Sequence, residues 1–168
     1  LLQRTAAATP SAPTKFLRLG IDSPDELIEG FPLKEEDLFT YSGLILGSVE
    51  ASAFTVEQLR MIADFVSRRG GGLLTLGGRR AFAEGGWGGT PVAEALPIAL
   101  DAAANARAGS YFSHVSIEPA RAGLTHPIAQ LAATEKASIE AWDKLPALTS
   151  VFKTQPLGWA ELALALAI

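Results

Sequence analysis

The chain has 168 residues, of which 48% are hydrophobic and 19% are charged, so it is long enough for one domain with a substantial core. Its net charge of −4 gives no general electrostatic reason to bind nucleic acid or an anionic membrane surface. The absence of cysteine excludes disulfides, thiolate metal sites and thiol nucleophiles. No run of residues approaches the roughly 20 apolar positions of a membrane span, and the N-terminus has no signal-peptide pattern.

The first forty or so residues predict only short elements. Residues 1–5 are typical of the end of a strand, and residues 16–21 of a strand near a sheet edge. A turn then begins at Ser23, and residues 34–39 predict a short helix. The chain begins without methionine and ends in an apolar run at residues 160–168, so we expect residues 1–168 to form a single domain cut from a larger protein.

The best-specified element is a helix that begins after Thr55 and ends at Gly70. Thr55 and Gln58 have the spacing of a capping box, in which each side chain satisfies a backbone N–H of the first turn. Gly70 supplies the left-handed residue that ends the helix. Apolar residues recur at three- and four-residue spacing and so share one face, which we expect to be buried: Leu59, Ile62, Phe65 and Val66.

Short apolar runs flank this helix on both sides. Residues 41–47 and 73–76 are typical of strands that are covered on both faces, as in a parallel sheet. Strand, helix and strand in this order predict a right-handed βαβ crossover. Ligands of open parallel sheets bind beyond the carboxyl ends of the strands, so we expect a site at residues 47–53 and 77–89.

The remaining chain predicts shorter elements. Thr90 and Pro91 begin a short helix, and a further short helix is expected at residues 128–133. Residues 101–110 have the composition of a loop, and residues 137–142 are expected to form a turn. Strands are expected at residues 98–100, 115–119, 150–154 and 162–166.

The glycine-rich loop at residues 77–89 is the strongest candidate for a functional site. It presents many backbone N–H groups and carries two arginines, which suits an anion or a carboxylate. It matches neither common phosphate-binding motif, and the simpler interpretation is tight packing of the glycine backbone, with the tryptophan capping the core. Glu50 projects at the same edge, where it either pairs with an arginine or orients a ligand. The candidate binding residues are Glu50, Gly77, Gly78, Arg79, Arg80 and Trp87.

The sequence gives little support for a catalytic or metal site. The two histidines, His114 and His126, lie in no known catalytic or metal-binding motif, and each is more simply a strand-end or turn residue. Nothing pairs the carboxylates, which include Asp101, Asp143 and the cluster at residues 35–37. We expect no catalytic residue of the known kind, no metal and no cofactor. A hydroxyl of Ser48 or Ser52, or His126 with a carboxylate, is the alternative for an enzyme.

Several of these stretches resemble the glutamine amidotransferase-like domains of the class I, flavodoxin-like superfamily. The resemblance is carried by residues 41–52 (YSGLILGSVEAS), the Gln58 helix, residues 69–78 (RGGGLLTLGG), Phe82 and residues 85–87 (GGW). It is closest to the variety found in large bacterial membrane-linked proteins, often beside a von Willebrand factor A domain. The resemblance implies an α/β, three-layer flavodoxin-like fold with a mostly parallel central sheet, from which the family's first strand and helix are missing.

The resemblance also implies that glutaminase activity is absent. In true class I amidotransferases a cysteine occupies the elbow after the second of these strands, with a histidine and a glutamate near the C-terminus. Here the elbow is Gly77-Gly78, and the chain contains no cysteine. His126, which precedes a proline, is similar to the His-Pro turn of amidotransferase-like relatives rather than to the triad histidine. No catalytic residue of the family therefore carries over.

We therefore expect a catalytically silent module that binds a partner segment or a small anionic ligand at the edge formed by Glu50, Arg79, Arg80 and Trp87. Its natural partners are the other domains of a larger bacterial protein, whose inner-membrane anchor would lie outside this chain. One alternative is a hydrolase or transferase of the same superfamily with a non-cysteine site. The other is a purely structural assembly module. Nucleic acid and direct membrane insertion are not expected.

Overall fold

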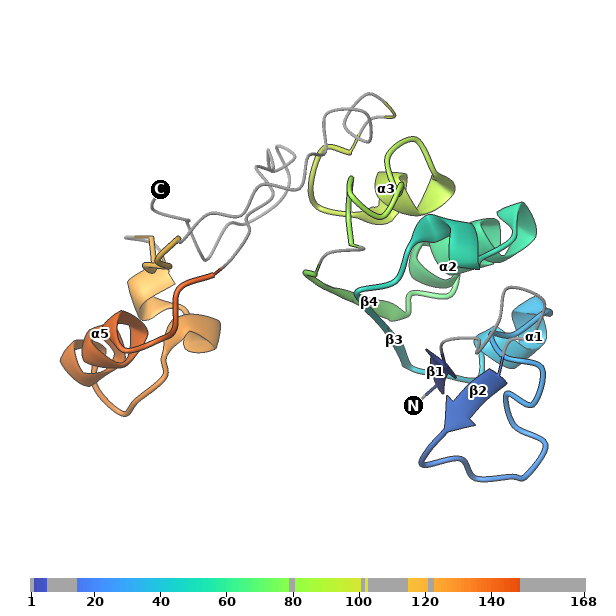
Figure 1. Ribbon diagram of the computed structural model, residues 1–168, viewed down its shortest axis with the longest axis horizontal. Helices are drawn as coiled ribbons and strands as arrows, with labels where there is room; N and C mark the ends of the chain where they lie inside the picture. The colour runs from blue at the N-terminus through green and yellow to red at the C-terminus, as the bar shows by residue number, and fades with distance from the viewer. Residues whose placement is uncertain are drawn as a thin grey trace.

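The computed structural model describes residues 2–5, 15–78, 81–100, 102, 115–120 and 123–148. This part of the chain has a mixed α/β architecture with two small sheets (Figure 1). Strands β1 (Leu2–Thr5) and β2 (Lys15–Arg18) pair in antiparallel orientation, and β3 (Gly43–Gly47) and β4 (Gly72–Leu76) in parallel orientation. The sequence therefore predicted the α/β class and one parallel pair.

The first sheet is shorter than expected. Strand β2 ends at Arg18 rather than at residue 21, because Gly20 adopts a φ of 62° and turns the chain. The guanidinium of Arg18 then donates to the carbonyl oxygens of Pro24 at 2.7 Å and Glu26 at 2.9 Å. These bonds fix the following turn against the end of the strand.

Helix α2 (Val56–Ser67) confirms the predicted capping box. The Thr55 hydroxyl accepts from the Gln58 backbone N–H at 3.2 Å, and the Gln58 side chain accepts from the Thr55 N–H at 3.0 Å. Gly70 has a φ of 74°, as expected for the residue that ends a helix. The predicted face is buried at Leu59, Ile62 and Phe65 and half-buried at Val66. The short helix α1 (Glu35–Leu38) packs beside α2 and confirms the prediction for residues 34–39.

Strands β3 and β4 are joined through α2 and pair from Gly43 opposite Gly72 to Gly47 opposite Leu76, which confirms the strand–helix–strand unit. The α3 helix (Pro91–Ala95) begins at the predicted Thr90 cap and joins the same core. The inward side chains of the pair pack with α2 and α3, whereas Ile45, Leu74 and Leu76 are exposed by 65%, 52% and 48%. Among the described residues, α2 and α3 share one core and cover one face of the pair, so the expectation that both faces are covered stays a prediction.

The C-terminal described residues form a separate group of helical segments (Figure 1). They are η2 (Gly123–Thr125), η3 (Pro127–Ala129) and α5 (Glu135–Asp143). The turn expected at residues 137–142 is wrong, because Thr134 caps a nine-residue helix there by accepting from the Ala137 N–H at 3.3 Å. The helix expected at residues 128–133 is wrong too, because the chain turns in short 3-10 segments before it reaches α5.

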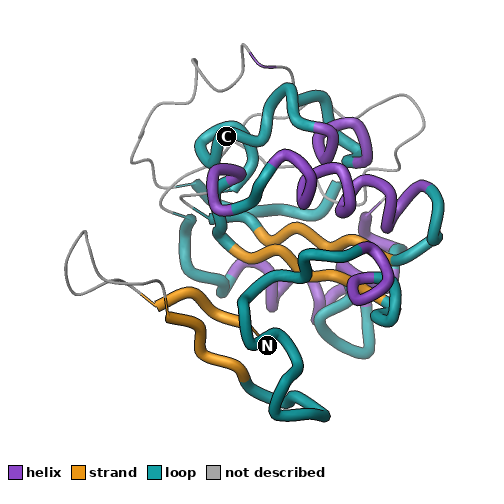
Figure 2. The backbone as a smooth tube through the Cα atoms, turned by 90° about the vertical axis from the view of Figure 1, so that its right-hand side faces the viewer, coloured by secondary structure: helices purple, strands orange, loops and turns teal. Residues whose placement is uncertain are grey.

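Several predicted strands are only single bridge positions in the structure, and others lie outside the described residues. Within the described residues, Ile98 and Glu118 form single bridge positions, and Val115 forms one antiparallel bridge to Leu148. The strands expected at residues 150–154 and 162–166 lie outside the described residues, as does the loop at residues 101–110 apart from Ala102. Figure 2 shows the two small sheets and the helices that accompany them from a second direction.

Candidate functional site

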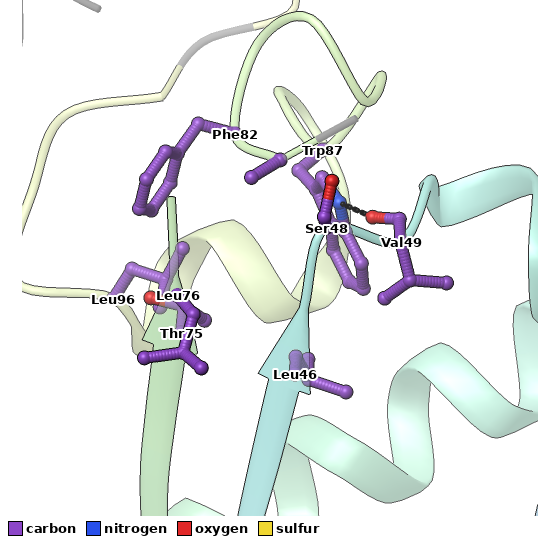
Figure 3. A pocket seen from close by; sticks show the side chains of 9 residues that line it. Leu46, Ser48, Val49, Thr75, Leu76, Phe82, Trp87 and Leu96 are labelled. Atoms are coloured by element: carbon purple, nitrogen blue, oxygen red, sulfur yellow. Dashed lines mark hydrogen bonds between the residues drawn. The ribbon is translucent and has the colours of Figure 1, made fainter. Parts of the chain in front are cut away.

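The loops that follow β3 and β4 meet at the carboxyl ends of the two strands. The N–H of Ala51, in the short helix η1 (Ala51–Ala53), donates to the carbonyl oxygen of Gly85 at 2.8 Å. The indole N–H of Trp87 donates to the carbonyl oxygen of Val49, also at 2.8 Å (Figure 3). We call the described part of these two loops, residues 47–53 and 77–78 with 81–90, the carboxyl edge. It contains four of the six residues predicted to bind a ligand: Glu50, Gly77, Gly78 and Trp87.

Trp87 anchors the carboxyl edge to the core. It is only 4% exposed, and its ring lies 5.8 Å from the ring of Phe54, which in turn meets Phe31 edge-on at 5.1 Å. Such aromatic contacts stabilise the fold beyond the effect of burying apolar area, and the hydrogen bond to Val49 satisfies the indole N–H. The simpler interpretation of Trp87, that it caps the core, is therefore confirmed.

Ser48 and Gly78 approach each other closely where the two loops begin. A Cβ atom added to Gly78 would lie 2.5 Å from Ser48 Oγ and 2.7 Å from Ser48 Cβ, so position 78 has no room for a side chain. Ser48 itself has a φ of 42°, and Phe82 in the second loop has a φ of 52°. These left-handed conformations are uncommon for residues other than glycine and concentrate at functional or tightly constrained sites. Sequence reasoning missed both of them, because neither residue type signals a positive φ.

A shallow pocket lies between the two loops at the carboxyl edge. Its volume is about 260 Å³, including the space open to solvent, and its lining is mainly apolar with the hydroxyls of Ser48 and Thr75 among it (Figure 3). Pockets that bury drug-sized ligands span about 300–1,000 Å³, and the enclosed part of this one has room for about one water molecule. The pocket suits a single small apolar side chain or methyl group better than a whole metabolite.

The charged residues of the predicted site are only partly described. Glu50 is half-buried directly before η1, whereas Arg79 and Arg80 lie outside the described residues. The pairing of Glu50 with one of these arginines therefore stays a prediction. In the described part of the chain, no group of three or more acidic or histidine residues could hold a metal ion.

The structure does not bring together the serine and histidine residues of the alternative catalytic site. His126 lies between η2 and η3, in the group of segments that stands apart from β3 in Figure 1, whereas Ser48 and Ser52 lie at the carboxyl edge. The His126 backbone donates to the carbonyl oxygen of Gly123 and accepts from Ala129, each at 3.0 Å, which confirms its place in a turn. His114 and Asp101 lie outside the described residues.

Two other polar clusters are structural rather than part of this edge. The Tyr41 hydroxyl donates to the Glu26 carboxylate at 2.6 Å, just before the amino end of β3. Burial, followed by this bond to Glu26 and the nearby negative charges, raises the pKa of Tyr41 to about 12, and the same bond lowers the pKa of Glu26. Arg68 pairs with Glu35 at 3.2 Å and with Asp64 at 3.3 Å on the exposed side of α2, where ion pairs contribute little.

The described residues form a mixed α/β fold with a parallel strand–helix–strand unit, and the candidate site lies in the loops at the carboxyl ends of its two strands. Comparisons with protein-family models, with curated proteins and with solved structures find no significant match. In the described residues, no helix is both long enough and apolar enough to cross a membrane.

Proposed function

We propose that this chain is a non-catalytic, glutamine amidotransferase-like interaction module with a three-layer flavodoxin-like fold and a mostly parallel sheet. The parallel β3–α2–β4 unit supports this assignment, because such units build open sheets with a site at the carboxyl ends of the strands. The glycine elbow supports the lack of catalysis, because a side chain at position 78 would overlap Ser48. The chain also contains no cysteine.

The observation that carries the proposal is the fixed geometry of the carboxyl edge. The Trp87–Val49 and Ala51–Gly85 hydrogen bonds hold the two loops together through contacts within the chain itself. A preorganised surface loses less entropy when it binds, which favours recognition of a partner. The small apolar pocket within this surface accepts one side chain of a partner segment rather than a buried metabolite.

The expected occupant is an extended segment of another domain of a larger bacterial protein. One apolar side chain of this segment would enter the pocket beside Phe82, and an acidic group would meet Arg79 and Arg80, which provide a planar fork of donors for a carboxylate. Glu50 would orient the arginines or a donor of the segment. A small anionic ligand could use the same arginines without filling the pocket.

Binding of peptides and small anions by the purified chain tests this proposal. We expect selection from a peptide library to yield segments with an acidic and an apolar residue, and their affinity to fall in the double variant Arg79→Ala, Arg80→Ala. Arg60→Ala, on the exposed side of α2, is the matched control and should bind normally. In a parallel thermal-shift screen of amino acids, nucleotides, sugars and anions, a ligand at about 100 times its Kd would add about 2.7 kcal/mol to the free energy of unfolding.

Two alternatives predict other results. A purely structural assembly module, which the burial of Trp87 also supports, predicts that no peptide or anion binds and that the arginine variants change nothing. A hydrolase or transferase predicts turnover, and glutamine hydrolysis that is lost in a loop variant would overturn the proposal of a silent module.

A further inference from the structure

The outward face of the β3–β4 pair is apolar and uncovered by described residues. Cross-strand neighbours on this face are Gly43 with Gly72, Ile45 with Leu74, and Gly47 with Leu76. None of the six carries a charge, and Ile45, Leu74 and Leu76 are 65%, 52% and 48% exposed. Two-stranded sheets are marginally stable alone, and parallel sheets normally have both faces covered. This face therefore needs a covering layer.

A second apolar surface lies on the C-terminal group of segments. Helix α5 has nine residues, of which only Ser138 is buried, whereas short helices depend on tertiary packing for their stability. Its inner side is fixed to the preceding turn, because the Trp142 indole donates to the carbonyl oxygen of Ala129 at 2.7 Å. Four large apolar side chains in and around the helix stay 37–47% exposed: Leu131, Ile139, Leu145 and Leu148.

The two surfaces can reach each other. In Figure 1, α5 lies apart from the β3–β4 pair, on the other side of the pair from α2 in that view. Ala102 lies against Gly89 of the first group, so residues 103–114 connect the two groups. At about 3.3–3.6 Å per extended residue they span up to about 43 Å. Because the connection is covalent, this surface is present at a high effective concentration near the sheet.

We propose that the α5 group, which comprises the described residues of 115–148, docks on the outward face of β3–β4 and forms the missing layer. Ile139 and Leu145 then cover Ile45 and Leu74. The glycines at positions 43, 47 and 72 carry no side chain, so the backbone of the covering segment can lie close to the strands. The interface is centred on Ile45 and Leu74 and reaches the carboxyl edge only at Gly47 and Leu76, so the loops beyond them stay open to a partner. The inference rests on the three-layer fold of the proposed function, whereas binding at the carboxyl edge can be present or absent independently of it.

Engineered cysteine pairs test this interface directly, because the natural chain contains no cysteine. The test pair is Leu74→Cys with Ile139→Cys, and the matched control is Leu74→Cys with Arg60→Cys, since Arg60 lies on the exposed side of α2. A short bis-maleimide reagent should cross-link the test pair within one chain, as seen by mass spectrometry of a monomeric product, and should not cross-link the control.

The labelling rate of the single variant Leu74→Cys is the second readout. We expect slow reaction with a thiol reagent in the native chain and faster reaction when Ile139→Asp is added, with both variants keeping the circular dichroism spectrum of the parent. A cross-link only between two chains would assign the face to a second copy and overturn the proposal. Equal cross-linking of test and control pairs, or fast labelling of Leu74→Cys in both backgrounds, would also overturn it.

Discussion

The indole N–H of Trp87 lies 2.8 Å from the carbonyl oxygen of Val49 and joins the loop after β4 to the loop after β3. Both partners come from segments that follow parallel strands, so one hydrogen bond connects the ends of the two strands. Trp87 is 4% exposed and Val49 is half-buried, so the bond is partly shielded from water. Together with the Ala51–Gly85 hydrogen bond, it holds the two loops side by side in one surface.

Replacing Trp87 with phenylalanine should lower the free energy of unfolding by about 1 kcal/mol, because the half-buried Val49 carbonyl loses its hydrogen-bond donor. Urea denaturation measures this change. Trp142→Phe is the control: it removes a similar bond of 2.7 Å to Ala129 but leaves the carboxyl edge intact. We expect only Trp87→Phe to weaken peptide binding, and equal effects of both variants on binding would contradict this role.

Gly78 and Gly77 should respond differently to the same substitution. Gly78→Ala places a Cβ atom 2.5 Å from Ser48 Oγ and should cost about 1–3 kcal/mol through overpacking. Gly77→Ala meets only the Phe82 ring at 3.9 Å and should be close to neutral. Thermal or urea unfolding of the two variants measures this difference in stability. Equal stability of Gly78→Ala and Gly77→Ala would contradict the close approach of Gly78 to Ser48.

Loss of the α2 capping box should destabilise the whole domain. Thr55→Ala removes the acceptor for the Gln58 N–H and should cost about 1 kcal/mol, whereas Thr55→Ser keeps the acceptor and should be nearly neutral. Gln58→Ala should cost more than Thr55→Ala, because the Gln58 amide also donates to the carbonyl oxygens of Phe31 and Pro32, each at 3.3 Å. An equal loss in the two alanine variants, measured by urea unfolding, would exclude a contribution from these two bonds.

The Tyr41–Glu26 bond should make stability depend on pH in alkaline solution. The pKa of Tyr41 rises from 10.0 to about 12 on folding, first because the phenol is buried and then because it donates to Glu26. The folded chain therefore keeps a proton that the unfolded chain releases, so this stabilisation is full below pH 10 and is lost as the pH rises toward 12. The lowered pKa of Glu26 has the opposite consequence, with stability lost as the pH falls through its folded value.

Ultraviolet titration of phenolate formation, together with unfolding measured at several pH values, checks this expectation. Tyr41→Phe should remove the late-titrating phenol and flatten the stability profile between about pH 10 and pH 12. Tyr111→Phe, which changes the protein's other tyrosine, should leave that transition in place. Persistence of the late transition in Tyr41→Phe would assign it to another group.

The sequence predicted elements that depend on local chemistry. The ends of α2 were predicted within a few residues from the Thr55–Gln58 capping box and from Gly70, which ends the helix. The start of α3 was predicted in the same way from Thr90 and Pro91. Strands β3 and β4 were found as apolar runs, but such runs look alike whether one face or both are covered. The exposure of Ile45 therefore could not be predicted.

Other features depend on contacts between distant residues. The close approach of Gly78 to Ser48 links positions thirty residues apart, and nothing in either stretch signals it. The α5 helix was missed because its apolar periodicity is weak, although Thr134 followed by Glu135 is a usual helix start. Of the predicted binding residues, the structure unites Glu50, Gly77, Gly78 and Trp87, and the roles of Arg79 and Arg80 stay predictions.

The pairing of Gly43 with Gly72 also sets an order of events when the chain folds. The parallel strands cannot meet until the intervening segment is compact, because closing a loop of this length costs entropy before any strand contact forms. A locally encoded helix with its own cap shortens that loop before the strands pair. We therefore expect the α2 segment to gain helical structure before the β3–β4 ladder forms, and the helix to become stable only when the strands pack against it.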